Sequence, residues 1–255
     1  MRLPAPPRTI AIPMSETNPR LFIVSPHFDD AVFSCGALLA THPDAVVCTV
    51  FAAPPEPDMH TEWDRKAGFA SAHASMHART LEDDAALDVL DAVPVRMPFR
   101  DGQYLDSPSI SRLAAALEET IYRSTANTLV MPLGLHHPDH VLVFDACCEI
   151  LPRLSHLTWF AYADAIHRCR PGILEARFVD LTERGIVATP AQPVAADHTI
   201  GAERQALLKR EAVYAYESQL RAFGPDGWQD VFGAERYWQL SASRAPNRRP
   251  RKGAH

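Results

Sequence analysis

Histidine and aspartate side chains occur in two short groups that lie far apart in the chain. The first group is segment 25–30, Ser-Pro-His-Phe-Asp-Asp, in which His27, Asp29 and Asp30 could bind a cation. Imidazole and carboxylate are good zinc ligands, and a catalytic zinc site has three protein ligands and one position left for water. The side chains of adjacent aspartates diverge, so one can hold a metal while the other faces the water as a general base. The alternative is that both aspartates only cap a following helix.

The second group is segment 136–140, His-His-Pro-Asp-His. Pro138 suits the first turn of a helix, and two histidines that are three residues apart, His137 and His140, share one face of that turn. One of them could bind a metal while the other faces a substrate. Each group directly follows a predicted strand, which favours one shared site over two unrelated surface turns.

The elements that position these groups alternate between strands and helices. Short apolar, β-branched segments predict strands at 21–25, 44–51, 93–97 and 128–131. Helical spacing predicts helices at 31–40, at 64–90 with an interruption near Gly68, at 109–122 and at 137–150. Such alternation indicates an α/β, Rossmann-like fold, in which helices cover both faces of a mostly parallel sheet.

The last third of the chain predicts a smaller C-terminal β/α part. Strands are expected at 157–163, 176–181 and 186–193, and a helix is expected at 203–221. The organisation expected from these patterns is a flexible, proline-rich arm at 1–19, a single α/β domain at 20–240 and a disordered basic tail at 241–255.

The composition, 47% hydrophobic and 22% charged residues, is that of a globular protein. No apolar run is long enough to span a membrane, and the N-terminal segment does not have the pattern of a secretory signal, so a cytoplasmic protein is expected. The formal net charge of the chain is −6. The tail at 241–255 carries five basic residues and no acid, so the net charge of residues 1–240 is −11. Such an acidic body argues against a nucleic-acid partner.

Two other classes of site are disfavoured by missing motifs. The five cysteines contain no CxxC pair, so neither a disulfide framework nor a cysteine-ligated zinc site is expected. The chain also has no glycine-rich phosphate-binding motif, which argues against a nucleotide-binding protein.

Together the two groups resemble the motifs of the PIG-L/LmbE-type N-acetyl-sugar deacetylases. That family shares a PHPDDE motif near the N-terminus and an HPDH motif in mid-chain, which stand here as Pro-His-Phe-Asp-Asp-Ala at 26–31 and His-Pro-Asp-His at 137–140. The resemblance implies a zinc site, which could also take another divalent metal such as Fe²⁺, with His27, Asp30 and His140 as its ligands.

The resemblance also implies roles for the remaining motif residues. Asp29 corresponds to the general base. His137 corresponds to a residue that helps to stabilise the oxyanion, and it is a candidate to protonate the leaving amine. Asp139 corresponds to a residue that orients a neighbouring histidine. Two positions depart from the motif: Phe28 replaces a proline and would alter the pocket wall, and Ala31 replaces a glutamate and removes an acid near the metal.

Weaker similarity extends over roughly residues 20 to 240. The segment 79–82, Arg-Thr-Leu-Glu, is similar to one whose arginine contacts substrate, although a surface ion pair between Arg79 and Glu82 is the alternative. Asp101, in an Arg-Asp-Gly turn, is similar to an aspartate that binds a sugar hydroxyl. Asp164, after a late strand, is similar to a residue at the pocket rim. All three are therefore predicted to bind substrate.

The function that the resemblance implies is metal-dependent removal of an N-acetyl group from an amino-sugar-containing small molecule or glycoconjugate, with release of acetate and a free amine. Two alternatives stay open at this point. One is a metal amidase that acts on a non-acetyl amide, and the other is a non-catalytic relative that binds a metal or a sugar. The sequence predicts no particular oligomeric state.

Overall fold

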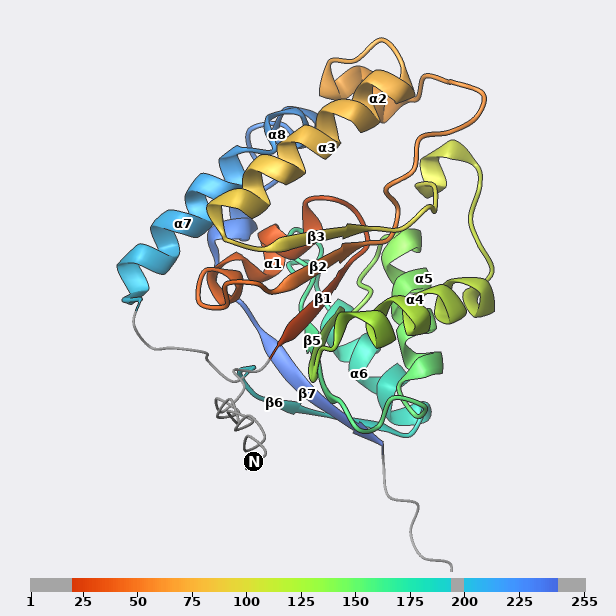
Figure 1. Ribbon diagram of the computed structural model, residues 1–255, viewed down its shortest axis with the longest axis vertical. Helices are drawn as coiled ribbons and strands as arrows, with labels where there is room; N and C mark the ends of the chain where they lie inside the picture. The colour runs from red at the N-terminus through yellow and green to blue at the C-terminus, as the bar shows by residue number, and fades with distance from the viewer. Residues whose placement is uncertain (1–19, 194–199, 243–255) are drawn as a thin grey trace, which may run out of the picture.

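The computed structural model describes residues 20–193 and 200–242. Its strands are β1 (Leu21–Ser25), β2 (Val46–Thr49), β3 (Val93–Arg96), β4 (Thr128–Pro132), β5 (Thr158–Tyr162), β6 (Ile186–Pro190) and β7 (Tyr237–Ala242). They form one seven-stranded sheet in the order β3-β2-β1-β4-β5-β7-β6. Strands β1 to β5 are parallel, whereas β7 runs antiparallel to β5 and β6. The predicted α/β fold is confirmed, and the C-terminal strands extend the same sheet (Figure 1).

Eight α-helices and two short 3₁₀ turns, η1 (Gly102–Tyr104) and η2 (Gln229–Phe232), complete the described part of the chain. The helices are α1 (Asp30–Leu39), α2 (Glu62–Ala67), α3 (Ala72–Val89), α4 (Ile110–Ser124), α5 (Pro138–Ile150), α6 (Ile173–Glu183), α7 (Ala202–Tyr214) and α8 (Glu217–Phe223). Among the described residues, none of these helices has the length and hydropathy needed to cross a membrane. The predicted arm at 1–19 lies outside the described residues, as does the predicted tail after Ala242.

Both faces of the sheet are covered, which explains why β1 is apolar at nearly every position. Leu21 and Ile23 pack on one face with residues of α1, α3 and α7. Phe22 and Val24 point to the opposite face and pack with residues of α4, α5 and α6. Because side chains alternate along a strand, burial on both faces requires apolar residues in consecutive positions.

The two His/Asp groups are brought together by strand order. Strand β1 pairs in parallel with β4 through Leu21–Thr128, Phe22–Leu129 and Ile23–Val130. The first group follows β1 and the second follows β4, so both emerge at the same edge of the sheet. The order in which strands are added to the sheet also reverses here, because β2 and β4 lie on opposite sides of β1. Crevices at such switch points are the usual binding sites of open α/β sheets.

The strand predicted at 176–181 is wrong, because this segment lies within helix α6. Four of its six residues are apolar, so the segment resembles a short strand, but its apolar residues also fit helical spacing. Leu174, Phe178 and Leu181 recur at intervals of four and three residues, and all three pack on the α5 side of the sheet. Packing against this face of the sheet, rather than the local sequence pattern, therefore determines that the segment is helical.

The helix predicted at 203–221 is interrupted in the structure. It divides into α7 and α8 at Ala215–Tyr216, where Tyr216 leaves the helical conformation with φ −83° and ψ 53°. The Tyr216 hydroxyl lies between the Phe28 carbonyl oxygen at 3.0 Å and a carboxylate oxygen of Asp83 at 2.9 Å. These contacts come from distant parts of the chain, so the interruption could not be predicted from local spacing. By contrast, the interruption predicted near Gly68 is confirmed, since Gly68 ends α2 with φ +91°.

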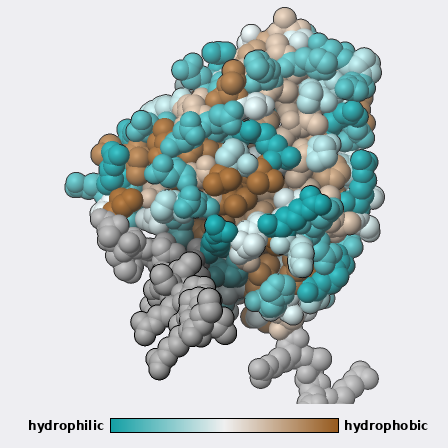
Figure 2. Space-filling model, in the orientation of Figure 1, coloured by the Kyte–Doolittle hydropathy of each residue, from teal (hydrophilic) through white to brown (hydrophobic). Residues whose placement is uncertain are grey.

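Strand β7 was not predicted, and its last two residues, Ser241 and Ala242, fall within the predicted tail. At the other end of the sheet, β3 is an edge strand with an exposed proline, Pro94, which has no N–H to donate to a further strand. Figure 2 shows apolar side chains at the surface near this edge, and Val93 of β3 is 43% exposed. The proline makes this edge a poor template for pairing with another chain.

A buried ion pair joins α7 and the start of β7 to helix α1. Helix α1 is kinked at Cys35 (φ −132°, ψ 15°), which releases backbone N–H groups in its second half. The Glu235 carboxylate accepts hydrogen bonds from four donors: the backbone N–H groups of Ala37 and Leu38, Lys209 Nζ and the Tyr237 hydroxyl. The side chains of Lys209 and Glu235 are only 7% and 9% exposed.

Glu235→Gln is expected to lower the free energy of unfolding by roughly 3 kcal/mol, because it leaves the Lys209 ammonium buried without its counter-charge. Urea denaturation followed by circular dichroism measures this change. Glu211→Gln, at an exposed position of the same helix α7, is the matched control and should be nearly neutral. Equal effects of the two substitutions would contradict the assigned role of Glu235.

Candidate active site

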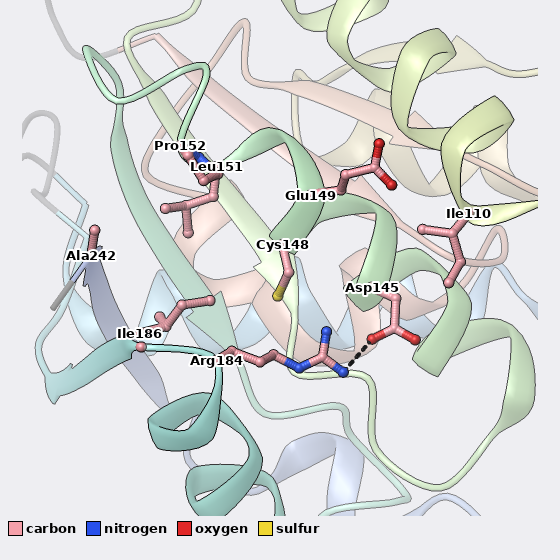
Figure 3. A pocket seen from close by; sticks show the side chains of 10 residues that line it. Ile110, Asp145, Cys148, Glu149, Leu151, Pro152, Arg184, Ile186 and Ala242 are labelled. Carbon is pink, nitrogen blue, oxygen red and sulfur yellow. Dashed lines mark ion pairs between the residues drawn. The ribbon is translucent and has the colours of Figure 1, made fainter.

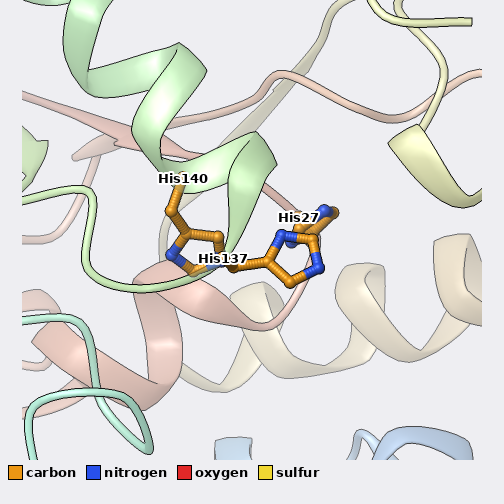
Figure 4. Close-up of side chains that lie close together, drawn as sticks. All are labelled: His27, His137 and His140. Atoms are coloured by element: carbon orange, nitrogen blue, oxygen red, sulfur yellow. The ribbon is translucent and has the colours of Figure 1, made fainter.

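Three side chains from the two His/Asp groups meet around one carboxylate oxygen. Asp30 Oδ2 lies 3.2 Å from His27 Nδ1 and 3.2 Å from His140 Nε2. The rings of His27 and His140 are 5.3 Å apart between centroids, so the two motifs converge as required for a shared ion (Figure 4). Ligand atoms bound tetrahedrally at about 2.0–2.2 Å from a zinc ion lie about 3.3–3.5 Å from one another, so the two distances to Asp30 Oδ2 are close to those of a metal site.

Each of these imidazoles is held by a second carboxylate on its other nitrogen. His27 Nε2 lies 3.1 Å from Asp139 Oδ2, and His140 Nδ1 lies 2.6 Å from Asp164 Oδ1. A carboxylate behind a histidine fixes its tautomer and orients the opposite nitrogen toward a metal. His27 therefore offers Nδ1 and His140 offers Nε2, which are the two atoms that face Asp30.

The electrostatics of this group favour positive charge. Burial by itself lowers the pKa of His140, but Asp30 and Asp164 outweigh burial and raise the pKa to about 9. Burial also opposes ionisation of His27, yet Asp101 and Asp139 raise the pKa of that imidazole well above its usual value. A buried site that holds protons on two imidazoles in this way has the charge balance to accept a cation in their place.

Asp29 does not cap helix α1, although its backbone stands at the N-cap position. Its side chain makes no capping hydrogen bond, and it lines the cavity beside Asp30. In the first turn the N–H of Ala31 donates instead to Ser25 Oγ, and Asp30 Oδ2 accepts from the N–H of His27, which precedes the helix. Burial and the neighbouring Asp30 carboxylate raise the pKa of Asp29 to about 6. The helix-cap alternative for Asp29 is therefore wrong, and its carboxylate is free to act in the cavity.

His137 presents a hydrogen-bond donor to the same cavity. It is the N-cap of α5, and its Nδ1 accepts from the backbone N–H of Asp139 at 3.3 Å. Burial and the charges of His27 and His140 lower the pKa of His137 to about 4. A neutral imidazole that accepts at Nδ1 carries its proton on Nε2, so this nitrogen can donate to an oxygen atom in the cavity.

Two other sets of side chains are close enough together to hold an ion. Ligand atoms of His27, His137 and His140 lie within 4.8 Å of one another, as do those of His27, Asp101 and Asp139. In the first combination, Nδ1 of His137 is occupied by the N–H that it caps. In the second, Asp139 Oδ2 accepts a hydrogen bond from the N–H of Gly102 at 2.9 Å. In the set centred on Asp30, Oδ2 likewise accepts from the N–H of His27, but each imidazole has a carboxylate on its opposite nitrogen that orients it.

Asp101 and Arg79 lie together at the cavity, as an ion pair with Arg79 Nη1 3.4 Å from Asp101 Oδ2. The alternative surface pair between Arg79 and Glu82 is wrong, because Arg79 is only 3% exposed and the Glu82 carboxylate accepts from Ser218. Asp101 Oδ2 also lies 3.8 Å from His27 Nε2. Both residues predicted to bind substrate therefore lie close to the candidate metal ligands.

Gly102 explains why the turn after Asp101 needs glycine. A Cβ at Gly102 would lie 2.6 Å from Asp139 Oδ1, closer than non-bonded atoms can approach. The missing side chain lets the N–H of Gly102 reach Asp139, which in turn contacts His27. The Asp-Gly pair therefore joins the second motif to the first.

Asp164 was predicted to bind substrate at the pocket rim, but the structure places it elsewhere. It is 1% exposed and does not line the cavity. One carboxylate oxygen contacts His140, and the other accepts from the N–H of Leu135 at 3.3 Å. This position suits a residue that orients His140. Phe28 likewise does not form the pocket wall, since it is fully buried, with the guanidinium groups of Arg79 and Arg96 5.6 and 5.7 Å from its ring centroid.

The cavity measures about 340 Å³ and includes side chains that the motifs did not indicate. These additional lining residues are Trp63, Gln103, Ile166, His167, Arg170, Gln219 and Phe223, and His136 of the second group lines the cavity as well. His136 and Ile166 have φ of +64° and +72°, which is uncommon for histidine and strained for a β-branched residue. The loop that carries Ile166 is held by Asp230, which accepts from the N–H of Ile166 and from Arg168.

No sequence signal identified these residues because they stand outside the motifs, on segments that approach the cavity only in three dimensions. His167 illustrates the point, since its ring lies 5.0 Å from that of His140 although 27 positions separate them. Burial and the charge of His140 lower the pKa of His167 to about 3.

A larger cavity of about 440 Å³ lies elsewhere, between α5, α6 and the end of β7. It is lined by Cys148, Leu151, Ile186 and other residues, and Arg184 in it pairs with Asp145 at 2.8 Å (Figure 3). None of the motif residues borders it. We therefore place the chemistry in the smaller cavity, where the candidate ligands and Asp29 are found.

Comparisons with known proteins give a family and a fold. The family model described as PIG-L, GlcNAc-PI de-N-acetylase, matches residues 22–151, more than half of the chain. No curated protein matches the chain. The solved structure of the A40926 pseudoaglycone deacetylase is 21% identical, with a TM-score of 0.70, and the match covers 89% of this chain and 99% of that one.

Two structures of a deacetylase from the teicoplanin biosynthetic pathway have the same fold. A triple mutant is 23% identical with a TM-score of 0.70, and the match covers 88% of this chain and 98% of that one. The complex with teicoplanin is 21% identical with a TM-score of 0.68, and the match covers 89% of this chain and 100% of that one. At these identities the likeness establishes the fold alone.

Proposed function

Because the chain belongs to the PIG-L family of de-N-acetylases, we propose that it is a metal-dependent hydrolase that removes an N-acetyl group from an amino-sugar-containing small molecule or glycoconjugate. The observation that carries this proposal is the position of Asp30 Oδ2, 3.2 Å from both His27 and His140. Beside it lies the carboxylate of Asp29, which makes no capping hydrogen bond to helix α1. A site that only bound a cation would not need this second acid.

His27, Asp30 and His140 would hold a zinc ion, or another divalent cation such as Fe²⁺, which would supply Lewis acidity toward a water molecule and the amide carbonyl. Asp29 accepts the proton of the attacking water. The Nε2–H group of His137 donates to the carbonyl oxygen as negative charge develops on it. The bond between the carbonyl carbon and nitrogen then breaks, and the proton taken by Asp29 passes to the departing amine. The products are acetate and a free amine.

Asp139 and Asp164 act behind the ligands rather than on the substrate. Asp139 orients His27, and Asp164 orients His140. Arg79 and Asp101 face the cavity as a charged pair, and we propose that they bind polar groups of the substrate. Such polar contacts fix the orientation of a ligand in a small cavity.

Asp164→Asn is expected to weaken zinc binding by about 10- to 100-fold, because the amide cannot supply the negative charge that fixes His140. A competition titration against a chromophoric zinc chelator measures the change in Kd. Asp145→Asn, in the larger cavity, is the control and should bind zinc as the wild type does. If Asp164→Asn keeps wild-type affinity, Asp164 does not orient a metal ligand.

A substrate screen tests the proposed reaction. Metal-free protein, zinc-loaded protein and zinc-loaded protein with chelator are incubated with a panel of N-acetylated amino sugars, and both acetate and free amine are measured. Equal amounts of the two products, only with metal, are expected. Release of an amine from other N-acyl compounds without activity on any acetyl compound would instead identify an amidase of different acyl specificity. Metal binding without any turnover would indicate a non-catalytic relative.

A further inference from the structure

We propose that one side of the cavity, formed by Trp63 and Phe223 and here called the aromatic wall, binds an apolar group of the substrate. The inference rests on the proposed hydrolase function and adds the chemical class of the substrate: an amide that carries an aryl or alkyl group within reach of the wall. The wall was not indicated by any motif, and its two residues come from α2 and from the end of α8.

The two rings form one continuous apolar surface. Their centroids are 5.0 Å apart and their planes meet at 70°, an edge-to-face contact. Both residues are half-buried and both line the cavity, together with Ile166 from the loop after β5. Half-exposed aromatic rings beside a cavity leave apolar area in water, and a ligand that covers this area gains binding free energy.

The wall has no hydrogen-bonding group left for a ligand. The indole Nε1–H of Trp63 donates to Gln219 Oε1 at 3.1 Å, and Gln219 itself is 1% exposed. The amide nitrogen of Gln219 donates to Ser218 Oγ at 3.0 Å. Because its one polar atom is satisfied within the protein, Trp63 presents only its ring. The two rings therefore offer a ligand no hydrogen bond, and an apolar group that lies against them leaves no polar group of theirs unpaired.

The rest of the cavity has the opposite character. Asp29, Asp30, Arg79 and Asp101 and the histidines of the second motif line it. A substrate that fits both parts has its amide and polar groups at the charged side and an apolar group on the wall. Such division is typical of specific sites, in which few polar groups set orientation and apolar area supplies affinity.

Hydrogen bonds fix the wall relative to the metal ligands. Helix α8 is anchored to α3, because Ser218 donates its N–H and its hydroxyl to Glu82 at 2.8 and 2.7 Å. Helix α2 is anchored to the charged side, because Thr61 Oγ1 donates to Gln103, whose amide donates to Asp101 at 2.8 Å. A wall held at both ends is in place before substrate arrives, which lowers the entropic cost of binding.

The apolar group could belong to the amine part of the substrate or to its acyl part, and two pairs of compounds separate these sources. The first pair is methyl and phenyl N-acetyl-β-glucosaminide, which differ only in the aglycone. The second pair is methyl glucosaminide with an N-acetyl or an N-hexanoyl group. In the wild type, one pair is expected to show kcat/KM at least about tenfold higher for its more apolar member.

Trp63→Ala is expected to remove this preference, with a loss of about tenfold on the apolar member and less than about twofold on methyl N-acetylglucosaminide. Trp63→Phe, which keeps an aromatic ring, should retain the preference. Tyr122→Ala is the matched control, because Tyr122 is an aromatic residue 83% exposed on α4 and outside the cavity. Phe223→Ala serves as a second variant if Trp63→Ala does not fold.

The outcomes separate this inference from the proposed function. If the wild type deacetylates the methyl compound but prefers neither apolar member, the inference about the aromatic wall is wrong and the proposed hydrolase function still holds. An equal loss of kcat/KM on all substrates in Trp63→Ala would lead to the same conclusion. If no compound is hydrolysed, the proposed function is wrong. The aromatic wall is then tested by calorimetry, which measures ligand binding to the zinc-loaded protein. The wild type should then bind phenyl glucosaminide more tightly than methyl glucosaminide, or hexanoate more tightly than acetate, and Trp63→Ala should show no such difference. Equal binding of both members of each pair by the wild type would contradict the proposed role of the aromatic wall.

Discussion

Asp29→Asn is expected to lower kcat by about 10²- to 10⁴-fold while the protein still binds one divalent cation per chain. The asparagine keeps the shape of the side chain but cannot accept the proton of the attacking water. The Asp29 side chain makes no capping hydrogen bond to α1, and asparagine has nearly the same size. The substitution should therefore leave stability almost unchanged. Acetate release measures turnover, and elemental analysis of the same preparation measures the metal.

Asp88→Asn provides the matched control for this experiment, because Asp88 is exposed on α3 and outside the cavity. It should have wild-type kcat. A near-wild-type rate in metal-loaded Asp29→Asn would show that another group takes the proton. Loss of the metal along with the activity would make Asp29 a ligand instead of a base.

His140→Ala is expected to abolish stoichiometric metal binding and, with it, all metal-dependent turnover. It removes one of the three proposed ligands and leaves Asp30 and Asp164 in a buried site without the imidazole that separates them. Elemental analysis should find about one metal per chain in the wild type and far less in the variant. His156→Ala, at an exposed position outside the cavity, should keep its metal.

The same measurement distinguishes the competing ligand sets. Asp30→Ala should lose the metal if Asp30 lies at the centre of the site. His137→Ala should keep the metal and lose activity, because His137 is proposed to donate to the oxyanion. The reverse result, with metal lost in His137→Ala and kept in Asp30→Ala, would favour the set of three histidines.

The fold was predictable wherever local pattern and tertiary demand agree. The strands that became β1, β2, β4 and β5 are short, apolar and bounded by polar turns, and burial on both faces of a parallel sheet requires that pattern. Prediction failed at segment 176–181, because a short, mostly apolar segment is compatible with either a strand or a helix. It also failed at Tyr216, where a hydroxyl bound to Phe28 and Asp83 ends a helix whose local spacing would continue.

The sequence by itself determined which chemical groups are available, because residue type and spacing in the two motifs limit them to imidazole and carboxylate. Only the tertiary structure decided which of them work together. Strand order places the loops after β1 and β4 side by side, so that Asp30 faces two imidazoles and Asp139 faces His27.

The same holds for Asp164 and for the aromatic wall. Asp164 lies behind His140 instead of at the rim, and Trp63 meets Phe223 across 160 positions of sequence. Contacts of this kind have no local signature, because they depend on how packed elements close against one another. Composition and spacing therefore identify the reactive groups, while packing sets their partners and the shape that a substrate must fit.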